Sequence, residues 1–336
     1  MKPSERVLNR IKNEPIDKIP NLNIIMMFAA REIGVPYSKY CQNHRLLVEG
    51  NIVCAEKYGL DCVTTMSDPV KETSALGGKV IFPEDDVPYV EDFPIKNSQD
   101  LLKAHPVNPC DSPRMTESVR AIELYRKKCK DEFAIIGWVE GCMAEAADLH
   151  GVNNFLVDLL DDTEFVTALL DLCLEQAILF ARDQIKAGAD IIGVGDAIAS
   201  VAGPIMYEEF ALPYELKLLK AIRDMGAKTK LHICGNTLPF IDMIPSDYCD
   251  IIDVDWMVPL EKVAAIHGQK SCISGNYDPV DVLLMGNKKK IAEAVESCAR
   301  IGGEKYISAA GCEVPRRTPP ENLKAVDDTL KNLMMH

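Results

Sequence analysis

The sequence predicts an α/β fold, a single (β/α)8 TIM barrel over residues 1–336, mainly because of how its apolar segments are spaced. From about residue 130 onward, short apolar runs rich in β-branched residues alternate with amphipathic stretches, as in parallel sheets whose strands are joined by helices. Each run ends at or beside Gly, Asp or Cys. Two earlier runs bring the total to about eight strands, the number in this type of barrel.

The individual elements follow from the same pattern. The expected strands are 21–27, 61–66, 133–139, 190–195, 228–234, 250–255, 270–275 and 305–310. The clearest helix starts after Asp161 and Asp162, whose carboxylates can cap it, and Gly188 ends it. Further helices are expected at Tyr207–Met225, Leu260–His267, Lys289–Ile301 and Pro320–Leu333. The proline-rich segment Val70–Glu132 predicts an irregular excursion after the second strand, over the end of the barrel, rather than a second domain.

Composition and charge exclude several classes of protein. Acidic residues outnumber basic ones by 51 to 37, for a net charge of −14, which disfavours nucleic acid and anionic membranes as partners. The chain has no apolar run of about 18–20 residues that could span a bilayer, and no signal-peptide pattern at its start, so a cytoplasmic protein is expected. Its twelve cysteines lack paired spacing, which favours reduced, buried thiols over disulfides.

The ends of the expected strands carry an unusual set of side chains. In a parallel barrel, functional groups gather where strands end, and here those positions hold Asp68, Glu140, Cys142, Asp196, His232, Cys234, Asp253, Asp255, Asn276 and Cys312. Because His232 and Cys234 are two residues apart on one strand, they project to the same side. With Cys312 they could form a three-ligand zinc site. The alternative is a hydrogen-bonded core histidine and two small apolar cysteines.

The carboxylates leave two interpretations open. Asp196, Asp253 and Asp255 could act as general acids or bases, or orient a zinc-binding histidine. For any single one of them, capping the helix that follows is a more common role than catalysis. Glu140 could complete the zinc site, contact substrate or interact with a helix dipole, and Asp68 could bind a polar group of the substrate or cap a helix.

Several segments resemble the uroporphyrinogen decarboxylase superfamily, whose fold is a single (β/α)8 barrel. They are ADIIGVGD at 189–196, PIMYEEFALPY at 204–214, SGNYDP at 274–279 and TPPENLKA at 318–325. Within the superfamily the chain is more similar to the corrinoid-dependent methyltransferases, which have His-x-Cys on the fifth strand and Gly-Cys after the eighth. His232, Cys234 and Cys312 match these positions.

This resemblance implies a zinc-dependent enzyme that moves a methyl group between a corrinoid and a small thiol, such as coenzyme M, or another methyl donor. Zn²⁺ would be held by His232, Cys234 and Cys312, and the corrinoid, a methylcobamide, would arrive on a separate corrinoid-binding protein. Asp68, Asp196, Asp253 and Asp255 are the catalytic candidates, and Glu140, Asn276 and Arg316 are the substrate-binding candidates. A homodimer is a further expectation.

Two other functions stay open at this stage. A porphyrinogen decarboxylase would use Asp68, which aligns with the aspartate of those enzymes, and a cluster of basic residues. The arginine-rich segment of the decarboxylases is replaced here by Phe28–Gly34, in which Arg31 is the only arginine, and so little positive charge suits a polycarboxylate poorly. A non-catalytic partner of a corrinoid protein is the other possibility, and the intact His232, Cys234 and Cys312 argue against it.

Overall fold

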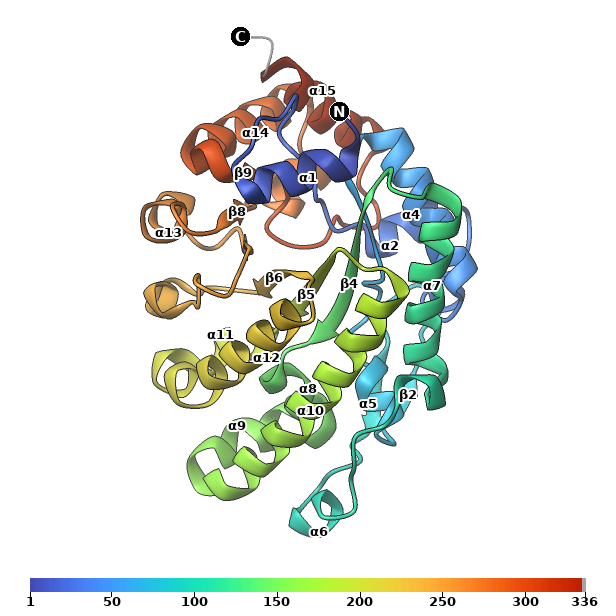
Figure 1. Ribbon diagram of the computed structural model, residues 1–336, viewed down its shortest axis with the longest axis vertical. Helices are drawn as coiled ribbons and strands as arrows, with labels where there is room; N and C mark the ends of the chain where they lie inside the picture. The colour runs from blue at the N-terminus through green and yellow to red at the C-terminus, as the bar shows by residue number, and fades with distance from the viewer. Residues whose placement is uncertain (334–336) are drawn as a thin grey trace.

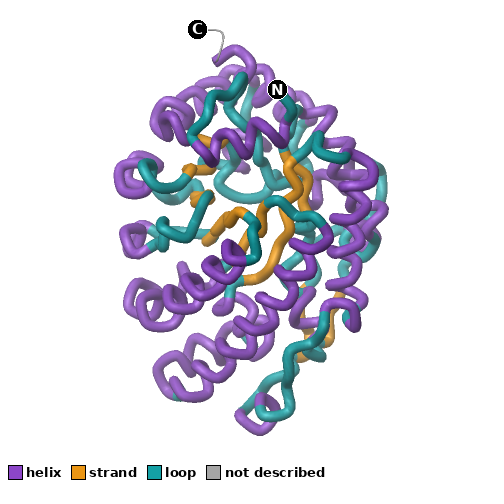
Figure 2. Tube along the Cα trace, in the orientation of Figure 1, coloured by secondary structure: helices purple, strands orange, loops and turns teal. Residues whose placement is uncertain are grey.

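The computed structural model describes residues 1–333 and is built around a curled parallel sheet of seven strands (Figures 1 and 2). The strands follow one another in chain order across the sheet and every neighbouring pair is parallel. They are β1 (Cys62–Thr64), β4 (Ala134–Glu140), β5 (Ile191–Gly195), β6 (Lys228–Ile233), β7 (Ile251–Val254), β8 (Cys272–Ser274) and β9 (Tyr306–Ile307). Parallel neighbours in chain order give a barrel-like α/β fold.

A short bridge at residues 21–22 connects the two edges of this sheet. The Asn21 carbonyl accepts a hydrogen bond from the Asp61 amide (2.9 Å), and the Leu22 amide donates to the Ser308 carbonyl (2.8 Å). The sequence predicts a strand at 21–27, but helix α2 (Met26–Glu32) already starts at Met26. The Asn23 side chain replaces one of the backbone hydrogen bonds that a strand at 21–27 would have formed, since its Oδ1 accepts from the Ala310 amide at 2.8 Å.

Helices cover the outside of the sheet, as Figure 2 shows. The principal ones are α4 (His44–Tyr58), α7 (Pro113–Cys129), α10 (Thr163–Ala187), α12 (Leu212–Asp224), α13 (Leu260–His267), α14 (Lys288–Gly302) and α15 (Pro320–Leu333). The predicted caps of α10 are present: the Asp162 side chain accepts from the Phe165 amide, and Gly188 adopts a left-handed conformation with φ 113°. No helix within residues 1–333 is both long and apolar enough to cross a membrane.

One end of the barrel is closed and the other carries loops and short helices. Helix α1 (Pro3–Lys12) places Val7 in an inner core with residues of six strands, including Ile136, Ile191 and Ile251.

The remaining helices are α3 (Tyr37–Tyr40), α5 (Lys71–Ala75), α6 (Ser98–Leu101), α8 (Cys142–His150), α9 (Val152–Asp161) and α11 (Ala197–Met206). Short 3-10 or π segments are η1 (Pro109–Asp111), η2 (Tyr207–Ala211), η3 (Leu238–Met243), η4 (Pro279–Leu284) and η5 (Gly303–Lys305).

The segment between β1 and β4 is more regular than the prolines predict. It contains α5, α6, a two-stranded antiparallel hairpin of β2 (Lys79–Ile81) and β3 (Tyr89–Asp92), and the long helix α7. Ser112 caps α7 by accepting from the Met115 amide, and Pro113 occupies the first turn, which suits its fixed φ. Asp85, in the loop of the hairpin, lies 2.8 Å from Arg316, so the hairpin contacts the segment that follows β9.

Candidate metal centre

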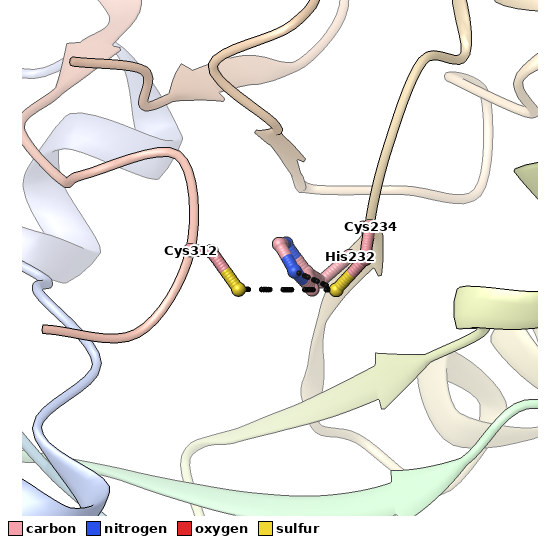
Figure 3. Close-up of side chains that lie close together, drawn as sticks. All are labelled: His232, Cys234 and Cys312. Atoms are coloured by element: carbon pink, nitrogen blue, oxygen red, sulfur yellow. Dashed lines mark hydrogen bonds between the residues drawn. The ribbon is translucent and has the colours of Figure 1, made fainter. Parts of the chain in front are cut away.

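His232, Cys234 and Cys312 lie together at the carboxyl end of the sheet (Figure 3). His232 is on β6 and Cys234 directly follows that strand, so both side chains point to the same side. Cys312 comes from the loop after β9. His232 Nε2 is 2.9 Å from Cys234 Sγ, which is 4.0 Å from Cys312 Sγ. Within residues 1–333, this is the only group of three or more His, Cys, Asp or Glu ligand atoms close enough to share an ion.

The spacing and chemistry of these atoms fit zinc. Two sulfur ligands about 2.3 Å from one tetrahedral zinc ion lie about 3.8 Å apart, close to the 4.0 Å between Cys234 and Cys312. The donor set of one imidazole and two thiols also favours zinc over magnesium or calcium, which prefer oxygen ligands. His232 is buried and both cysteines are partly exposed, as a catalytic site with an open position requires.

Two charged residues lie behind His232. Asp253 Oδ2 is 3.0 Å from His232 Nδ1 and 3.1 Å from Lys230 Nζ, and all three side chains are buried. A carboxylate on Nδ1 leaves Nε2 free to bind a metal. Sequence reasoning missed Lys230, although Lys230 and His232 share one face of β6 and their two-residue spacing could have revealed it.

These contacts shift the pKa values of the ionisable groups at the site. Burial alone would raise the pKa of Asp253, but Lys230 and His232 lower it to about 2. Burial alone would lower the pKa of His232, and Asp253 and Cys312 raise it to about 10. The Cys234 thiol and the His232 side chain lower the pKa of Cys312 to about 4, whereas the hydrogen bond with Cys312 raises the pKa of Cys234. The cluster therefore favours a negative charge on the Cys312 sulfur.

Asp255 and Asn276 shape the loops around the site. Asp255 accepts hydrogen bonds from the Gly235 and Met257 amides, both at 2.9 Å. Asn276 Nδ2 donates to the carbonyls of Asp255 (3.1 Å) and Val258 (2.6 Å). Gly235 directly follows Cys234, so Asp255 fixes the backbone beside a candidate ligand.

Asp196 caps a neighbouring helix rather than the one that follows it. Its Oδ1 accepts from the Ala144 amide in the first turn of α8 at 2.9 Å. A Cβ on Gly141 would lie 2.5 Å from Asp196, so glycine is needed for this close approach. Burial raises the pKa of Asp196 to about 7.

Glu140 lies at the end of β4, where Trp138 Nε1 donates to its Oε1 at 3.1 Å. Burial and the nearby Glu72 raise the pKa of Glu140 well above its usual value. The Trp138 ring lies over β5: a Cβ on Gly193 would be 2.3 Å from the ring, and one on Gly195 would be 2.9 Å from it. These glycines therefore make room for an indole.

Asp68 and Arg316 are engaged in ion pairs. Asp68 is buried, accepts from Ser67 Oγ at 2.6 Å, and pairs with Arg114 and Lys71. These cations lower the pKa of Asp68 against the effect of burial. Sequence reasoning missed Arg114, and no local pattern could reveal it because it lies 46 residues away on α7. Arg316 is partly exposed, pairs with Asp85 and lies outside the three-residue cluster.

Comparisons with known proteins identify the family and match the fold. The family model described as Uroporphyrinogen decarboxylase (URO-D) matches residues 2–333. The chain is 27% identical over 342 residues to the methylcobamide:CoM methyltransferase MtbA of Methanosarcina acetivorans, covering 98% of each chain. It is 26% identical to a uroporphyrinogen decarboxylase of Trichodesmium erythraeum, over 91% of this chain and 88% of that one. The solved structure of a methyltransferase from Methanosarcina mazei has the same fold, with a TM-score of 0.91, 24% identity and full coverage of both chains.

Proposed function

The chain belongs to the uroporphyrinogen decarboxylase family, and we propose that within it the protein is a zinc-dependent methyltransferase that moves a methyl group between a corrinoid and a thiol or another methyl donor. The observation that carries this proposal is the convergence of His232, Cys234 and Cys312 at the carboxyl end of the sheet. The similarity to relatives named methylcobamide:CoM methyltransferase supports it.

Each residue of the centre has a defined role in this proposal. His232 would bind zinc through Nε2, and Cys234 and Cys312 would bind through their thiolates. Bound zinc would lower the pKa of a coordinated substrate thiol, or polarise the oxygen of a methyl donor. Asp253 would keep the Nδ1 proton on His232 and so fix its orientation. Lys230 would balance the buried charge of Asp253.

The other candidate residues act on the shape of the site. We assign Asp255 and Asn276 to holding the loops beside Cys234, and Asp196 to holding the start of α8 next to β5. Glu140 and Arg316 remain proposed substrate contacts. Asp68 is a weaker catalytic candidate, because Arg114 and Lys71 already neutralise it.

The proposal includes a partner and a complete barrel. A methylcobamide would be presented by a separate corrinoid protein in the cytoplasm, and the whole chain would act as one barrel domain that holds the site at its mouth. Residues 21–22, which join β1 and β9, would take the place of the eighth strand. A homodimer is also proposed.

A paired assay tests the function. Purified protein is analysed for metal, then incubated with methylcobalamin and coenzyme M while the corrinoid spectrum is followed, and separately with uroporphyrinogen while carbon dioxide is measured. We expect one zinc per chain, demethylation of the corrinoid and no carbon dioxide. Carbon dioxide release with an unchanged corrinoid would instead establish a decarboxylase. Zinc binding without either reaction would exclude coenzyme M and direct the search to donors such as aryl methyl ethers.

A further inference from the structure

A groove lies on the outside of the barrel, between α6 with the loop that follows it and the first half of α10 (Figure 1). Its volume is about 750 Å³. None of the residues that line it belongs to the candidate metal centre or to a strand of the sheet. The groove is therefore a concave surface separate from the site to which the chemistry is assigned.

Apolar side chains line both sides of this groove. On α10, Phe165, Ala168 and Leu172 follow one another at intervals of three and four residues, which places them on one face of the helix. Phe165 and Leu172 are buried, whereas the small Ala168 between them is exposed. On the other side, Leu102 directly follows α6 and is 80% exposed. Most of the apolar surface of Leu102 is therefore open to a ligand.

A row of carboxylates runs beside the apolar face of α10. Glu164, Asp171 and Glu175 all line the groove and are exposed. Asp171 accepts a hydrogen bond from the Tyr214 hydroxyl at 2.9 Å, which is a neutral donor and leaves the negative charge in place. These positions recur at the spacing of one helix face, so the carboxylates form a charged edge along the apolar surface.

Basic side chains in the groove do not offset these carboxylates. Within residues 1–333, no lysine or arginine lines the groove. His105 is the one lining residue that can carry a positive charge, and Lys103, although exposed in the same loop, lies outside the lining. The groove therefore combines apolar surface with a net negative charge.

We propose that this groove docks a basic, amphipathic helix of a partner protein, an inference that goes beyond the proposed function. Apolar side chains of that helix would pack against Ala168 and Leu102, and its lysines or arginines would pair with the carboxylates of α10. Glu164 and Glu175 are about three turns, or about 16 Å, apart along α10. A partner helix of similar length reaches both of them, whereas a small amine reaches only one. Charge and length together therefore select a cationic helical segment.

Binding of a synthetic peptide tests this proposal. The probe is a fluorescein-labelled peptide of about 16 residues built from leucine, alanine and lysine, with the leucines on one helical face and the lysines beside it. A second peptide has glutamine in place of every lysine. Fluorescence anisotropy at about 150 mM salt should give saturable binding of the lysine peptide with a micromolar Kd, and about tenfold weaker binding of the glutamine peptide.

A pair of charge variants locates the binding surface. Glu164→Gln/Glu175→Gln should raise the Kd of the lysine peptide about fivefold and leave that of the glutamine peptide unchanged. Glu123→Gln/Glu296→Gln removes the same charge from exposed positions on α7 and α14, and should change either Kd by less than about twofold. Zinc content and thermal unfolding should stay the same in both variants, because every substituted side chain is exposed.

A second pair of variants tests the apolar contact. Leu102→Ser should raise the Kd of both peptides about fivefold, since it removes apolar surface that the bound helix would cover. Met285→Ser, at a methionine that is 75% exposed outside the groove, is the matched control and should leave both values unchanged.

Three results would overturn the docking site. Equal losses in the groove variants and their controls would mean that the peptide responds to the overall charge of −14 and not to the groove. Equal binding of the two peptides would remove the selection for a basic partner. Self-association that Leu102→Ser abolishes in analytical ultracentrifugation, with an unchanged peptide Kd, would assign the groove to a second copy of the chain. None of these results bears on the proposed function, which zinc content and methyl transfer test separately.

Discussion

His232 depends on two charged residues that lie deeper in the barrel. Asp253 lies between His232 and Lys230, with its Oδ2 3.0 Å from the imidazole and 3.1 Å from the ammonium group. Lys230 is only 2% exposed, and a buried charge is tolerated only when it is paired. The buried ion pair of Asp253 and Lys230 therefore supports His232 from the side away from the two cysteines.

Replacing Asp253 with asparagine should weaken zinc binding, although all three candidate ligands remain in place. The substituted amide would keep the size of the side chain but lose the charge that favours the Nδ1 proton, and such changes typically cost about 10–100-fold in metal affinity. Competition with a chromogenic chelator measures this. Asp255→Asn, which alters the nearby loop anchor instead, is the comparison. Equal zinc affinity in wild type and Asp253→Asn would show that Asp253 does not orient His232.

Removing the buried lysine should destabilise the whole chain. Lys230→Met leaves Asp253 with one fewer compensating charge, and breaking a buried ion pair costs about 3–5 kcal/mol of unfolding free energy. Lys228→Met is the matched control on the same strand, because Lys228 is half-exposed and pairs with Asp250 at 3.3 Å; it should cost at most about 1 kcal/mol. Similar losses in both variants, measured by urea denaturation, would contradict the role given to Lys230.

Cys312→Ala should remove zinc and activity while preserving the fold. Cys312 is partly exposed in a loop, so losing its sulfur removes little packing, whereas a site reduced to two protein ligands should lose its metal. Metal analysis and thermal unfolding of the variant check both parts. Cys110→Ala, at an exposed cysteine far along the chain from the centre, should retain zinc. A Cys312→Ala protein that retains full zinc content and activity would show that Cys312 is not a zinc ligand and has only a structural role.

At the level of elements, apolar periodicity predicts most of the sheet but not its closure. The predicted strand at 133–139 differs from β4 by one residue at each end, and that at 190–195 differs from β5 by one residue at its start, because buried parallel strands form unbroken apolar runs. The run at 21–27 is equally apolar, yet only Asn21 pairs as a bridge and Met26 begins a helix. Sequence alone could not reveal this. The Asn23 side chain replaces a backbone hydrogen bond of the sheet by accepting from the amide of Ala310, which lies 287 residues further along the chain.

The close packing of β4 on β5 gives a further prediction. Gly193→Ala would place a Cβ 2.3 Å from the Trp138 ring, and overpacking of this kind costs about 1–3 kcal/mol of unfolding free energy. In a Trp138→Leu background the same change should cost clearly less, because the ring is gone. A double-mutant cycle by chemical denaturation measures the difference. Equal costs in both backgrounds would show that the glycine serves another purpose.

At the scale of the whole molecule, the sequence predicted the candidate ligands better than the groups that support them. His232 and Cys234 follow from the two-residue period of a strand, and Cys312 follows from its place after the last strand. The partners of Asp68 and Asp196 do not, because Arg114 and the first turn of α8 come from distant parts of the chain. Contacts of that kind depend on how the helices pack around the sheet, which no local pattern encodes.

Buried acids should make the stability of the whole chain fall as pH rises. Burial raises the pKa of Glu72 to about 7, and burial together with Asp196 raises that of Glu215 to about 8. In the unfolded chain both groups titrate near 4.5. Between these values these two carboxyl groups hold more protons in the folded state than in the unfolded state, so their contribution to the free energy of unfolding decreases with pH and levels off above about 8.

Glu215→Gln should make the free energy of unfolding less dependent on pH. A glutamine can still accept the hydrogen bond that Tyr207 donates to Glu215 at 2.6 Å, but it has no proton to lose, so the variant should gain stability over wild type as pH rises from about 5 to about 8. Glu123→Gln, at an exposed position on α7, should follow the wild-type curve. Urea denaturation at several pH values measures all three proteins. A Glu215→Gln curve parallel to wild type would mean that Glu215 is already ionised in the folded protein, and that the interior around α12 tolerates its charge.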